Sequence, residues 1–469
     1  MGAWSEPVTA SRRLPSEVGA RDAALAILDR VEAGRGHSNT LLADLPMGMP
    51  ERDRALCTEL VYGVLRHRAL LDESIAAVSR RPLESIDRRL LGVLRLAAYQ
   101  ILVLTRVPWP AAVDEAVRMA KARGRAGSGA FANGVLRALC RAVEAKTIPP
   151  ARARPDPGSR APEFRDWLAR EVSFPRPLVD RYLDRHGCES GEALLRALNQ
   201  PASVALRPTR RGGSPEALAR GLAAEGVETV PSPVLPGALR VVRGVPQRTE
   251  MFGGGAFYIQ DEAAQMVALL LEPLSPSHRL VDLCAAPGGK ILQAADHLGP
   301  AQGMLLAADR SPRRLRRLQE NASRMGLSWI RCVAMEAERP ALLGRFDRVL
   351  LDAPCSGTGV IRRHPEIRWR RTESDIRRHA AAQDRALRAA CGLLAREGRL
   401  VYAVCSLEPE EGPERIDAVL RARDDLRLVD ARLILPGSLH RFVNGSGALE
   451  TLPHRDDVDG FFAAVLSLC

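Results

Sequence analysis

Two cysteines lie where the sequence predicts the ends of buried strands. Cys355 belongs to the run DAPCSGTG at residues 352–359, and Cys405 belongs to the run VYAVCSL at residues 401–407. A cysteine thiolate is a nucleophile that can split a difficult reaction into easier steps through a covalent intermediate. The position of these two cysteines, with an Asp and a Pro beside one of them, indicates reactive thiols. A lone cysteine is usually a small buried hydrophobe, and we expect that role for Cys57, Cys140, Cys188, Cys332, Cys391 and Cys469.

A third motif, DLCAAPGGK at residues 282–290, follows a short apolar run and precedes the helical pattern of residues 291–298. In a doubly wound sheet, ligands bind at the carboxyl ends of the strands. Glycines at such a turn let the backbone approach a ligand, and the next helix offers free N–H groups. The run does not fit GxxxxGK[ST], which disfavours a nucleotide P-loop. The motif therefore predicts a cofactor loop.

Two acidic residues follow the next two predicted strands. Asp309 comes about 20 residues after the glycines, where an acid is placed to bind ribose hydroxyls. The alternative role for Asp309 is a helix cap or a partner for the arginines near it. Glu336 follows the third strand in the equivalent place and gives a weaker signal.

The elements that position these residues predict a multidomain α+β protein. Residues 19–147 carry apolar residues at helical spacing and are expected to form an all-helical domain. Residues 148–162 are rich in Pro and Arg and are expected to form a linker. Residues 163–250 mix short helices and strands, which indicates a small α/β module. From residue 251 to residue 469, apolar strands alternate with helices, as in a doubly wound, Rossmann-like sheet. The strands expected in these regions are 203–207, 238–242, 279–283, 304–308, 329–333, 348–351, 399–404 and 460–466.

Composition and charge narrow the class of protein. The 469 residues are 46% hydrophobic and 26% charged, which excludes a disordered chain. The 68 Lys+Arg outnumber the 56 Asp+Glu, and only Lys121, Lys146 and Lys290 are lysines. A GC-rich genome explains the arginine skew, and an anionic partner such as RNA is the other explanation. The surplus of arginines gathers at residues 310–317 and 362–378.

Cysteine spacing and hydropathy exclude further classes. The nine cysteines form no CxxC pair, so we predict no metal site. An odd number of scattered cysteines is typical of a reducing compartment. Residues 1–10 lack the apolar core of a signal peptide, and the longest apolar run, residues 90–104, is too short to span a bilayer. We therefore expect a cytoplasmic monomer with no membrane partner.

The three motifs resemble those of the Sun/Fmu-type RNA cytosine carbon-5 methyltransferases, which use S-adenosylmethionine (SAM). The runs YIQDEAAQ at 258–265, VIRRHPE at 360–366 and DGFF at 459–462 match the same family. The resemblance implies a SAM-dependent methyltransferase domain in the C-terminal part of the chain.

The N-terminal region is similar to the NusB RNA-binding fold. The matching runs are LVYGVLR at 60–66, DEAV at 114–117 and FANGVLR at 131–137. A NusB-like domain joined to a Sun-type domain is the arrangement of bacterial enzymes that methylate small-subunit (16S) ribosomal RNA. The resemblance therefore implies ribosomal RNA as the partner.

The family's chemistry gives the site residues their implied roles. Cytosine carbon-5 becomes a nucleophile only after a thiolate has added to carbon-6. The resemblance implies that Cys405 is this thiolate, that Cys355 assists release of the methylated product, and that Asp352 holds the cytosine edge. DNA cytosine methyltransferases instead attack with the cysteine after the proline, and the residues alone leave both assignments open.

The resemblance also implies the cofactor contacts. Asp309 would bind the SAM ribose, Glu336 would approach the adenine, and Asp352 would also lie near the charged end of SAM. The SAM loop would be formed by Cys284, Ala285, Ala286, Pro287, Gly288, Gly289 and Lys290.

The chain departs from the family pattern at three positions. Val404 stands where the family usually has Thr, Ile291 where it has Thr or Ser, and Glu336 where it has Asp. The first two remove hydroxyl groups that could hydrogen-bond near the site. These departures and the NusB-like region support one alternative, a non-catalytic RNA-binding or ribosome assembly factor. A second alternative keeps the enzyme and changes its substrate to transfer RNA, and the NusB-like region weighs against it.

Overall fold

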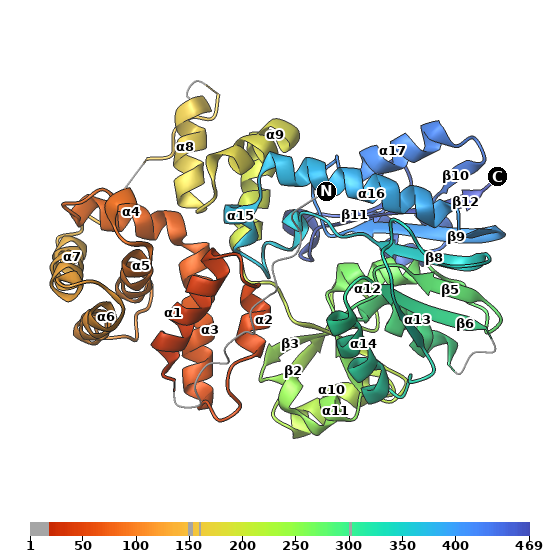
Figure 1. Cartoon of the computed structure of the whole chain (residues 1–469), viewed down its shortest axis with the longest axis horizontal. Helices are drawn as coiled ribbons and strands as arrows, with labels where there is room; N and C mark the ends of the chain where they lie inside the picture. The colour runs from red at the N-terminus through yellow and green to blue at the C-terminus, as the bar shows by residue number, and fades with distance from the viewer. Residues whose placement is uncertain (1–17, 149–152, 159–160, 300–302) are drawn as a thin grey trace. The chain divides into compact units, whose positions relative to one another are not determined.

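The computed structural model describes nearly the whole chain (Figure 1). The described residues are 18–148, 153–158, 161–299 and 303–469.

Contacts divide the chain into two compact units. The first unit comprises Met1–Asn199 and Arg363–Arg370, and the second comprises Gln200–Arg362 and Arg371–Cys469. A short segment from the C-terminal half of the sequence is thus packed as part of the N-terminal unit.

The first unit is helical, as the apolar spacing predicts. Its N-terminal helices are α1 (Ala20–Glu32), α2 (Ser38–Ala43), α3 (Glu51–Arg66), α4 (Arg68–Val78), α5 (Arg88–Leu102), α6 (Trp109–Arg123) and α7 (Ser128–Glu144). It also contains α8 (Ala161–Glu171), α9 (Arg176–Asn199) and the short α15 (Ile367–Arg370).

Helix α5 is the central helix of this unit and contacts α1, α3, α4, α6 and α7. It contains most of the longest apolar run of the sequence, and Arg95 interrupts that run. The guanidinium of Arg95 is buried and donates to Asp72 from Nε (2.6 Å) and to Glu32 from Nη1 (2.7 Å). The run is therefore the core of a helical domain. No helix in the described part of the chain is long and apolar enough to cross a membrane.

The second unit begins with a small four-stranded antiparallel sheet in the order β2-β3-β1-β4. Its strands are β1 (Ala205–Pro208), β2 (Glu228–Pro231), β3 (Leu239–Arg243) and β4 (Phe257–Ile259), with helices α10 (Pro215–Ala224) and α11 (Glu250–Gly253). Leu206, Leu218 and Phe257 form the centre of its own small core. The residues predicted to form one module, 163–250, thus belong to both units. Helices α8 and α9 pack in the first unit, and residues 200–250 belong to the second.

The main sheet has the order β10-β12-β9-β8-β5-β6-β7, with β11 paired to β12. Its strands are β5 (Arg279–Asp282), β6 (Met304–Asp309), β7 (Arg331–Ala334), β8 (Phe346–Asp352), β9 (Leu394–Val404), β10 (Leu426–Val429), β11 (Leu449–Thr451) and β12 (Phe461–Leu468). Strands β5 to β9 run parallel, while β12 pairs antiparallel with β9, β10 and β11.

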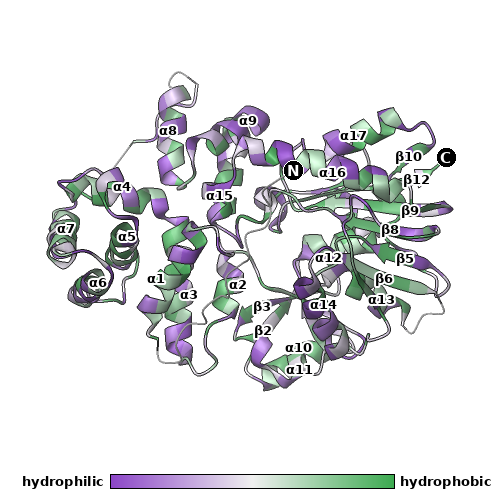
Figure 2. Ribbon diagram, in the orientation of Figure 1, coloured by the Kyte–Doolittle hydropathy of each residue, from purple (hydrophilic) through white to green (hydrophobic). Residues whose placement is uncertain are grey.

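Helices cover both faces of this sheet, and each strand supplies alternate residues to the two cores. Leu280 and Leu350 pack with α12 (Glu262–Leu269) and α13 (Gly289–Leu298), whereas Val281 and Leu351 pack with α16 (Glu373–Cys391). Because the central strands are buried on both sides, their apolar residues are consecutive near the carboxyl ends, as at residues 349–351 and 400–404 (Figure 2). Helices α14 (Pro312–Arg324) and α17 (Pro413–Ala422) complete the two layers.

The predicted fold class is confirmed, with one difference at the sheet edge. A helical N-terminal domain, a small α/β module and a doubly wound sheet are all present. The final strand, however, is antiparallel to its neighbour β9. Apolar alternation predicts that residues 460–466 form a strand but carries no information on its direction, which is set by the chain's return through β11.

Candidate active site

The two cysteines of interest meet at the carboxyl edge of the main sheet. Strands β8 and β9 are parallel neighbours, with Asp352 paired to Ala403. The amide of Ala353 donates to the carbonyl of Ala403 (2.8 Å) and holds the two strand ends together. As a result the Sγ atoms of Cys355 and Cys405 lie 3.3 Å apart, although the two residues are 50 positions apart in the chain.

The surroundings of Cys355 keep its thiol protonated. The hydrogen bond shared with Cys405 raises the pKa of Cys355 well above its usual range, and burial and the nearby Glu411 carboxylate add to this effect. Only a thiolate attacks an electrophilic carbon, so Cys355 at this place is suited to the role of a proton-bearing neighbour.

An ion pair lies beside the thiols. Lys290 Nζ donates to Asp352 Oδ2 at 2.7 Å, which joins the start of α13 to the end of β8. Burial alone would lower the pKa of Lys290, but the charge of Asp352 and this hydrogen bond outweigh it and raise that pKa. The ammonium also lies 5.2 Å from the centroid of the Phe461 ring. Lys290 is thus a fixed positive charge at the site.

The DLCAAPGGK run forms the turn between β5 and α13. Gly288 has φ 115°, a conformation that side chains rarely adopt, and the structure shows no side-chain cap at this helix N-terminus. The first-turn amides of α13 can therefore receive a ligand's acceptor atoms. The amide of Ala285 donates to the carbonyl of Ala308 (2.8 Å), which fixes the turn against β6.

Asp282 is a residue of this turn to which the sequence analysis gave no role. Its Oδ1 accepts from the amide of Cys284 (3.0 Å), and burial, together with the charge of Asp352, raises the pKa of Asp282 to about 8. Burial and the surrounding carboxylates also raise the pKa of Cys284, so that thiol stays protonated. The turn thus contributes backbone and shape, while its cysteine is not a nucleophile.

Asp309 lies at the end of β6, as predicted, and its contacts are those of the structural alternative, a cap for a turn and a partner for a nearby arginine. Its Oδ1 accepts from the amide of Ser311 (2.9 Å), and its Oδ2 accepts from the amide of Ala286 (3.3 Å). Arg314 Nη1 lies 3.2 Å from the same Oδ2. The acid therefore fastens the cofactor loop to β6. Glu336 lies just after β7 and is exposed.

The residues of this edge fit SAM by the chemistry of their groups. The uncapped helix N-terminus offers amide donors, the carboxylates of Asp309 and Asp352 offer acceptors for hydroxyl and amino groups, and Gly288 allows close backbone approach. These are complementary to the ribose, the amino acid end and the adenine of the cofactor.

A buried carboxylate that the sequence analysis missed lies behind both thiols. Glu411 accepts from the amide of Ser356 (2.8 Å) and from the hydroxyl groups of Ser356 and Ser406. The run EPEEG at residues 408–412 reads as an exposed acidic loop, and no signal in the sequence distinguishes Glu411 from its neighbours.

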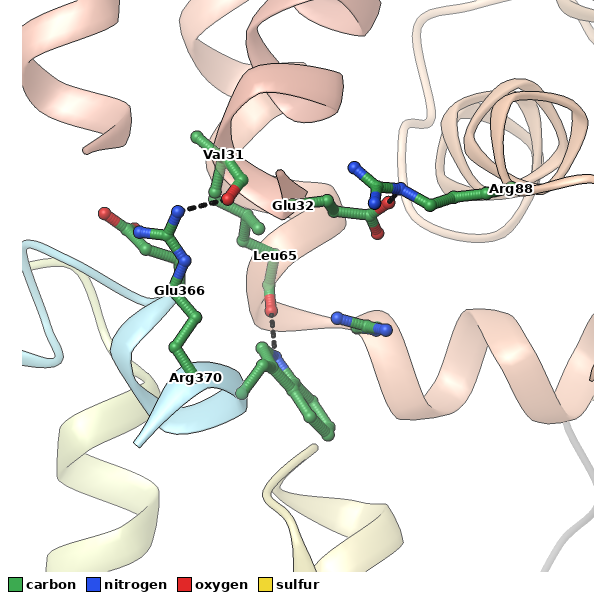
Figure 3. A pocket seen from close by; sticks show the side chains of 8 residues that line it. Val31, Glu32, Leu65, Arg88, Glu366 and Arg370 are labelled. Atoms are coloured by element: carbon green, nitrogen blue, oxygen red, sulfur yellow. Dashed lines mark hydrogen bonds and ion pairs between the residues drawn. The ribbon is translucent and has the colours of Figure 1, made fainter. Parts of the chain in front are cut away.

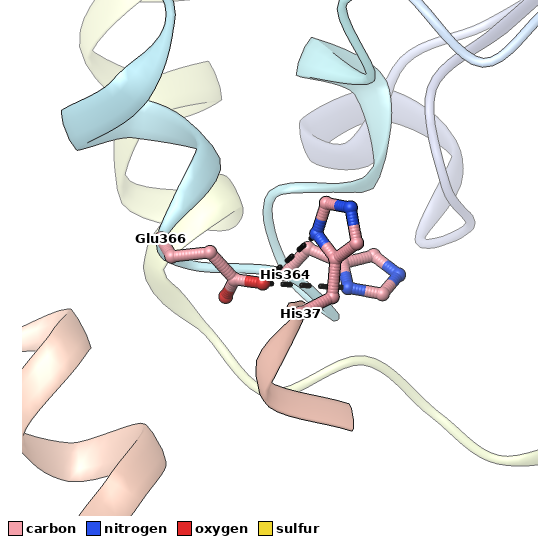
Figure 4. Close-up of side chains that lie close together, drawn as sticks. All are labelled: His37, His364 and Glu366. Carbon is pink, nitrogen blue, oxygen red and sulfur yellow. Dashed lines mark hydrogen bonds and ion pairs between the residues drawn. The ribbon is translucent and has the colours of Figure 1, made fainter. Parts of the chain in front are cut away.

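In the first unit, one group of described residues is close enough to bind a cation: His37, His364 and Glu366 (Figure 4). The nearest pair is His37 Nδ1 and Glu366 Oε1, at 3.3 Å. Glu366 already accepts from the amide of Ser38 (3.1 Å) and from its hydroxyl group (2.8 Å). Both carboxylate oxygens thus fasten segment 363–370 to the start of α2.

The same segment lines a pocket of about 280 Å³ in the first unit (Figure 3). Trp369 Nε1 donates to the carbonyl of Leu65 (3.1 Å), and Arg370 donates to the carbonyl of Val31. The Arg68 guanidinium lies 5.2 Å from the centroid of the Trp369 ring. The acidic and basic side chains that line the pocket already have partners within the protein. These contacts hold segment 363–370 against α1, α3 and α4.

The doubly wound sheet, the glycine turn before α13 and the acids that end β6 and β8 define a Rossmann-like methyltransferase class of domain. Comparison with known proteins agrees. Residues 268–467 match the family described as 16S rRNA methyltransferase RsmB/F, residues 19–141 match the NusB family, and residues 174–248 match the ferredoxin-like domain of RsmF/B-like methyltransferases.

The chain is 35% identical over 458 residues to the ribosomal RNA small subunit methyltransferase B of Klebsiella pneumoniae. The aligned region covers 95% of this chain and 96% of the relative. The chain therefore belongs to the RsmB/F family of 16S rRNA methyltransferases.

Solved structures share the fold. The crystal structure of PH0851 superposes with a TM-score of 0.77 at 24% identity, over 97% of this chain and all of that one. The structure of NSun6 from Pyrococcus horikoshii with SFG superposes with a TM-score of 0.56 at 24% identity, over 63% of this chain and 98% of that one.

Proposed function

We propose that this protein transfers a methyl group from SAM to carbon-5 of a cytosine in 16S ribosomal RNA through a covalent cysteine–cytosine adduct. The observation that carries the proposal is the pair of sulfur atoms 3.3 Å apart at the ends of β8 and β9, beside the Lys290–Asp352 ion pair. Family membership and the RNA named for the Klebsiella relative support the substrate class.

The first step uses Cys405 as the nucleophile. Its thiolate forms a bond to carbon-6 of the cytosine, and the electron pair of the carbon-5–carbon-6 double bond makes carbon-5 nucleophilic. Asp352 accepts from the exocyclic amine at the ring edge, and the Lys290 ammonium beside it stabilises the negative charge that develops on the ring. SAM supplies the methyl group that carbon-5 then takes.

The second step regenerates the enzyme. Carbon-5 loses its proton to a base, the double bond forms again, and the bond between Cys405 and carbon-6 breaks. Cys355 holds a proton next to the departing sulfur, which suits it to assist this release. The target cytosine must be unpaired or flipped out, because sulfur and methyl donor approach the ring from opposite faces.

The other parts of the chain are proposed to serve RNA binding. The NusB-like domain and the exposed arginines of residues 310–317, with Arg377 and Arg378, would bind phosphates, giving an affinity that falls with salt. Arg362 and Arg368 are buried and are not part of this surface. We keep the division into residues 19–147, 163–250 and 251–469 as a proposal for the functional domains, and we propose a cytoplasmic location for the enzyme.

A direct assay tests the proposal. Labelled SAM is incubated with unmodified 16S RNA or with transfer RNA transcripts, and the modified base is identified by mass spectrometry. Labelled 5-methylcytosine in 16S RNA is the expected product. Methylation confined to transfer RNA would show that the enzyme acts on transfer RNA and not on 16S RNA. If no RNA is methylated, the protein is a non-catalytic assembly factor.

A further inference from the structure

Glu411 joins the loops that carry the two thiols, and its contacts reach the residue after each cysteine. Its Oε1 accepts from the amide of Ser356 (2.8 Å), and its Oε2 accepts from the Ser356 hydroxyl (2.5 Å) and from the Ser406 hydroxyl. Glu411 and Ser356 have no exposed surface, and Ser406 is 3% exposed. One carboxylate thus holds both loops from behind.

The hydrogen bonds to Glu411 use both of its oxygens. Both serine hydroxyls reach Oε2, and the two hydroxyl oxygens lie 3.1 Å from each other. The Oε1 atom also faces Gln383 Nε2 at 3.3 Å. Burial raises the pKa of Glu411, while the hydrogen bonds from Ser356 and Ser406 lower it. An amide has only one acceptor oxygen, so Glu411→Gln cannot accept at both positions.

Glu411 makes more hydrogen bonds to the Cys355 loop than to the Cys405 loop. It binds Ser356 through the amide and the hydroxyl but Ser406 through the hydroxyl alone. Each loop also has other contacts: Arg371 Nε donates to the carbonyl of Ser356 (2.8 Å), and the amide of Gly359 donates to the carbonyl of Cys405 (3.1 Å). Loss of Glu411 therefore removes more bonds from Ser356 than from Ser406.

Hydrogen bonds in the turn after β9 hold the backbone of Glu411 in place. Tyr402, on β9, donates its hydroxyl to the carbonyl of Glu411 (2.5 Å). The Ser406 hydroxyl accepts from the amide of Glu408 (3.1 Å), which closes the turn between β9 and Glu411. The backbone of Glu411 is therefore anchored to β9, which ends just before Cys405.

We propose that Glu411 is a positioning residue that sets the spacing of the Cys355 and Cys405 sulfur atoms by holding Ser356 and Ser406. In its catalytic consequence this inference rests on the proposed function, because the spacing matters only if both thiols act on the substrate. Glu411 takes no part in the bonds that form or break. It acts on the two sulfur atoms only through Ser356 and Ser406.

A chemical test of the spacing needs no RNA. Diamide oxidises the two thiols to a disulfide and is itself reduced to a hydrazine, taking up the two electrons and two protons. Peptide mapping then measures the rate at which the Cys355–Cys405 link forms. We expect Glu411→Gln to slow this rate about 10-fold and Ser356→Ala to slow it less.

A catalytic test follows from the unequal hold on the two loops. Glu411→Gln should lower kcat about 10- to 100-fold, as expected when a reacting group is displaced by about 1 Å, and should leave SAM binding unchanged. The fraction of enzyme trapped as an RNA adduct should rise, because Ser356, next to Cys355, loses the larger number of hydrogen bonds. In the double variant Ser356→Ala/Glu411→Gln the losses should not add.

The matched control is Glu414→Gln, in the first turn of α17, where the side chain is 52% exposed and lies 3.8 Å from Arg415. It should match the wild type in disulfide rate and kcat. Equal disulfide rates and equal kcat for Glu411→Gln and the wild type would overturn the inference. If Glu411→Gln does not fold, Ser356→Ala and Ser406→Ala decide in its place, since each removes only a hydroxyl. If the wild type methylates no cytosine while its disulfide rate still depends on Glu411, the proposed function fails and the positioning role stands.

Discussion

Lys290 Nζ and Asp352 Oδ2 lie 2.7 Å apart, so the last residue of the cofactor loop and the first residue of the DAPC motif form one ion pair. The pair links the start of α13, the helix that follows β5, to the end of β8, and β5 and β8 are parallel neighbours in the sheet. It stands at the boundary between the groups proposed for SAM and those proposed for cytosine.

Replacing the lysine tests whether this pair stabilises charge during the reaction. Lys290→Met removes the only donor described on Asp352 Oδ2, and we expect kcat/KM to fall about 100-fold, the usual cost of losing one preorganised donor. Lys290→Arg should also lose activity, because a forked guanidinium does not replace a compact ammonium in a tight site. Methyl transfer at saturating SAM measures both variants. Arg396→Met, an exposed residue of β9, is the control and should keep the wild-type rate.

Replacing each of the two cysteines should block a different step of the reaction. Cys405→Ala should abolish methyl transfer and form no adduct, because no thiolate remains to add to carbon-6. Cys355→Ala should accumulate a protein–RNA adduct that survives on denaturing gels, because release lacks its proton-bearing neighbour. Cys469→Ala is the control and should behave as the wild type, since this cysteine is exposed, although the sequence predicts that it is buried. An active Cys405→Ala with an inactive Cys355→Ala would reverse the two roles.

The site could be predicted from sequence where chemistry follows a strand end, and not where it depends on a distant partner. Cys355 and Cys405 both follow apolar runs, and parallel strands end at one edge of a sheet. Nothing local marks Glu411, because its burial comes from the packing of a loop against β9. The direction of β12 was equally hidden, since apolar alternation is the same for either direction.

Arg95 should be essential to the stability of the first unit. It is 6% exposed and pairs with both Glu32 and Asp72, so Arg95→Ala leaves two carboxylates without their buried partner. We expect the free energy of unfolding to fall by about 3 kcal/mol. Arg88 also pairs with Glu32 but is 57% exposed, and Arg88→Ala should cost less than about 1 kcal/mol. Urea unfolding at pH 7 measures both, and equal losses would contradict this ranking.

Acid should loosen segment 363–370 through His364. Burial lowers the pKa of His364 to about 4, against an ordinary value of about 6.5, while the charge of Glu366 opposes the shift. Between these two pH values the unfolded chain binds more protons than the folded one, so stability falls as pH decreases from about 6.5 to about 4. Glu366, whose pKa is lowered to about 2 despite its burial by hydrogen bonds from His37 and Ser38 and by the charge of His364, contributes a further loss only below about pH 4.5.

The measurement is amide exchange in α2 and α15 at pH 7 and pH 5, with and without His364→Gln. Protection in the wild type should decrease on acidification, by up to about 2 kcal/mol from this residue, and His364→Gln should remove that part of the decrease. The variant keeps a polar side chain at the same place but takes up no proton. An identical loss of protection in the two proteins would show that His364 does not control the segment.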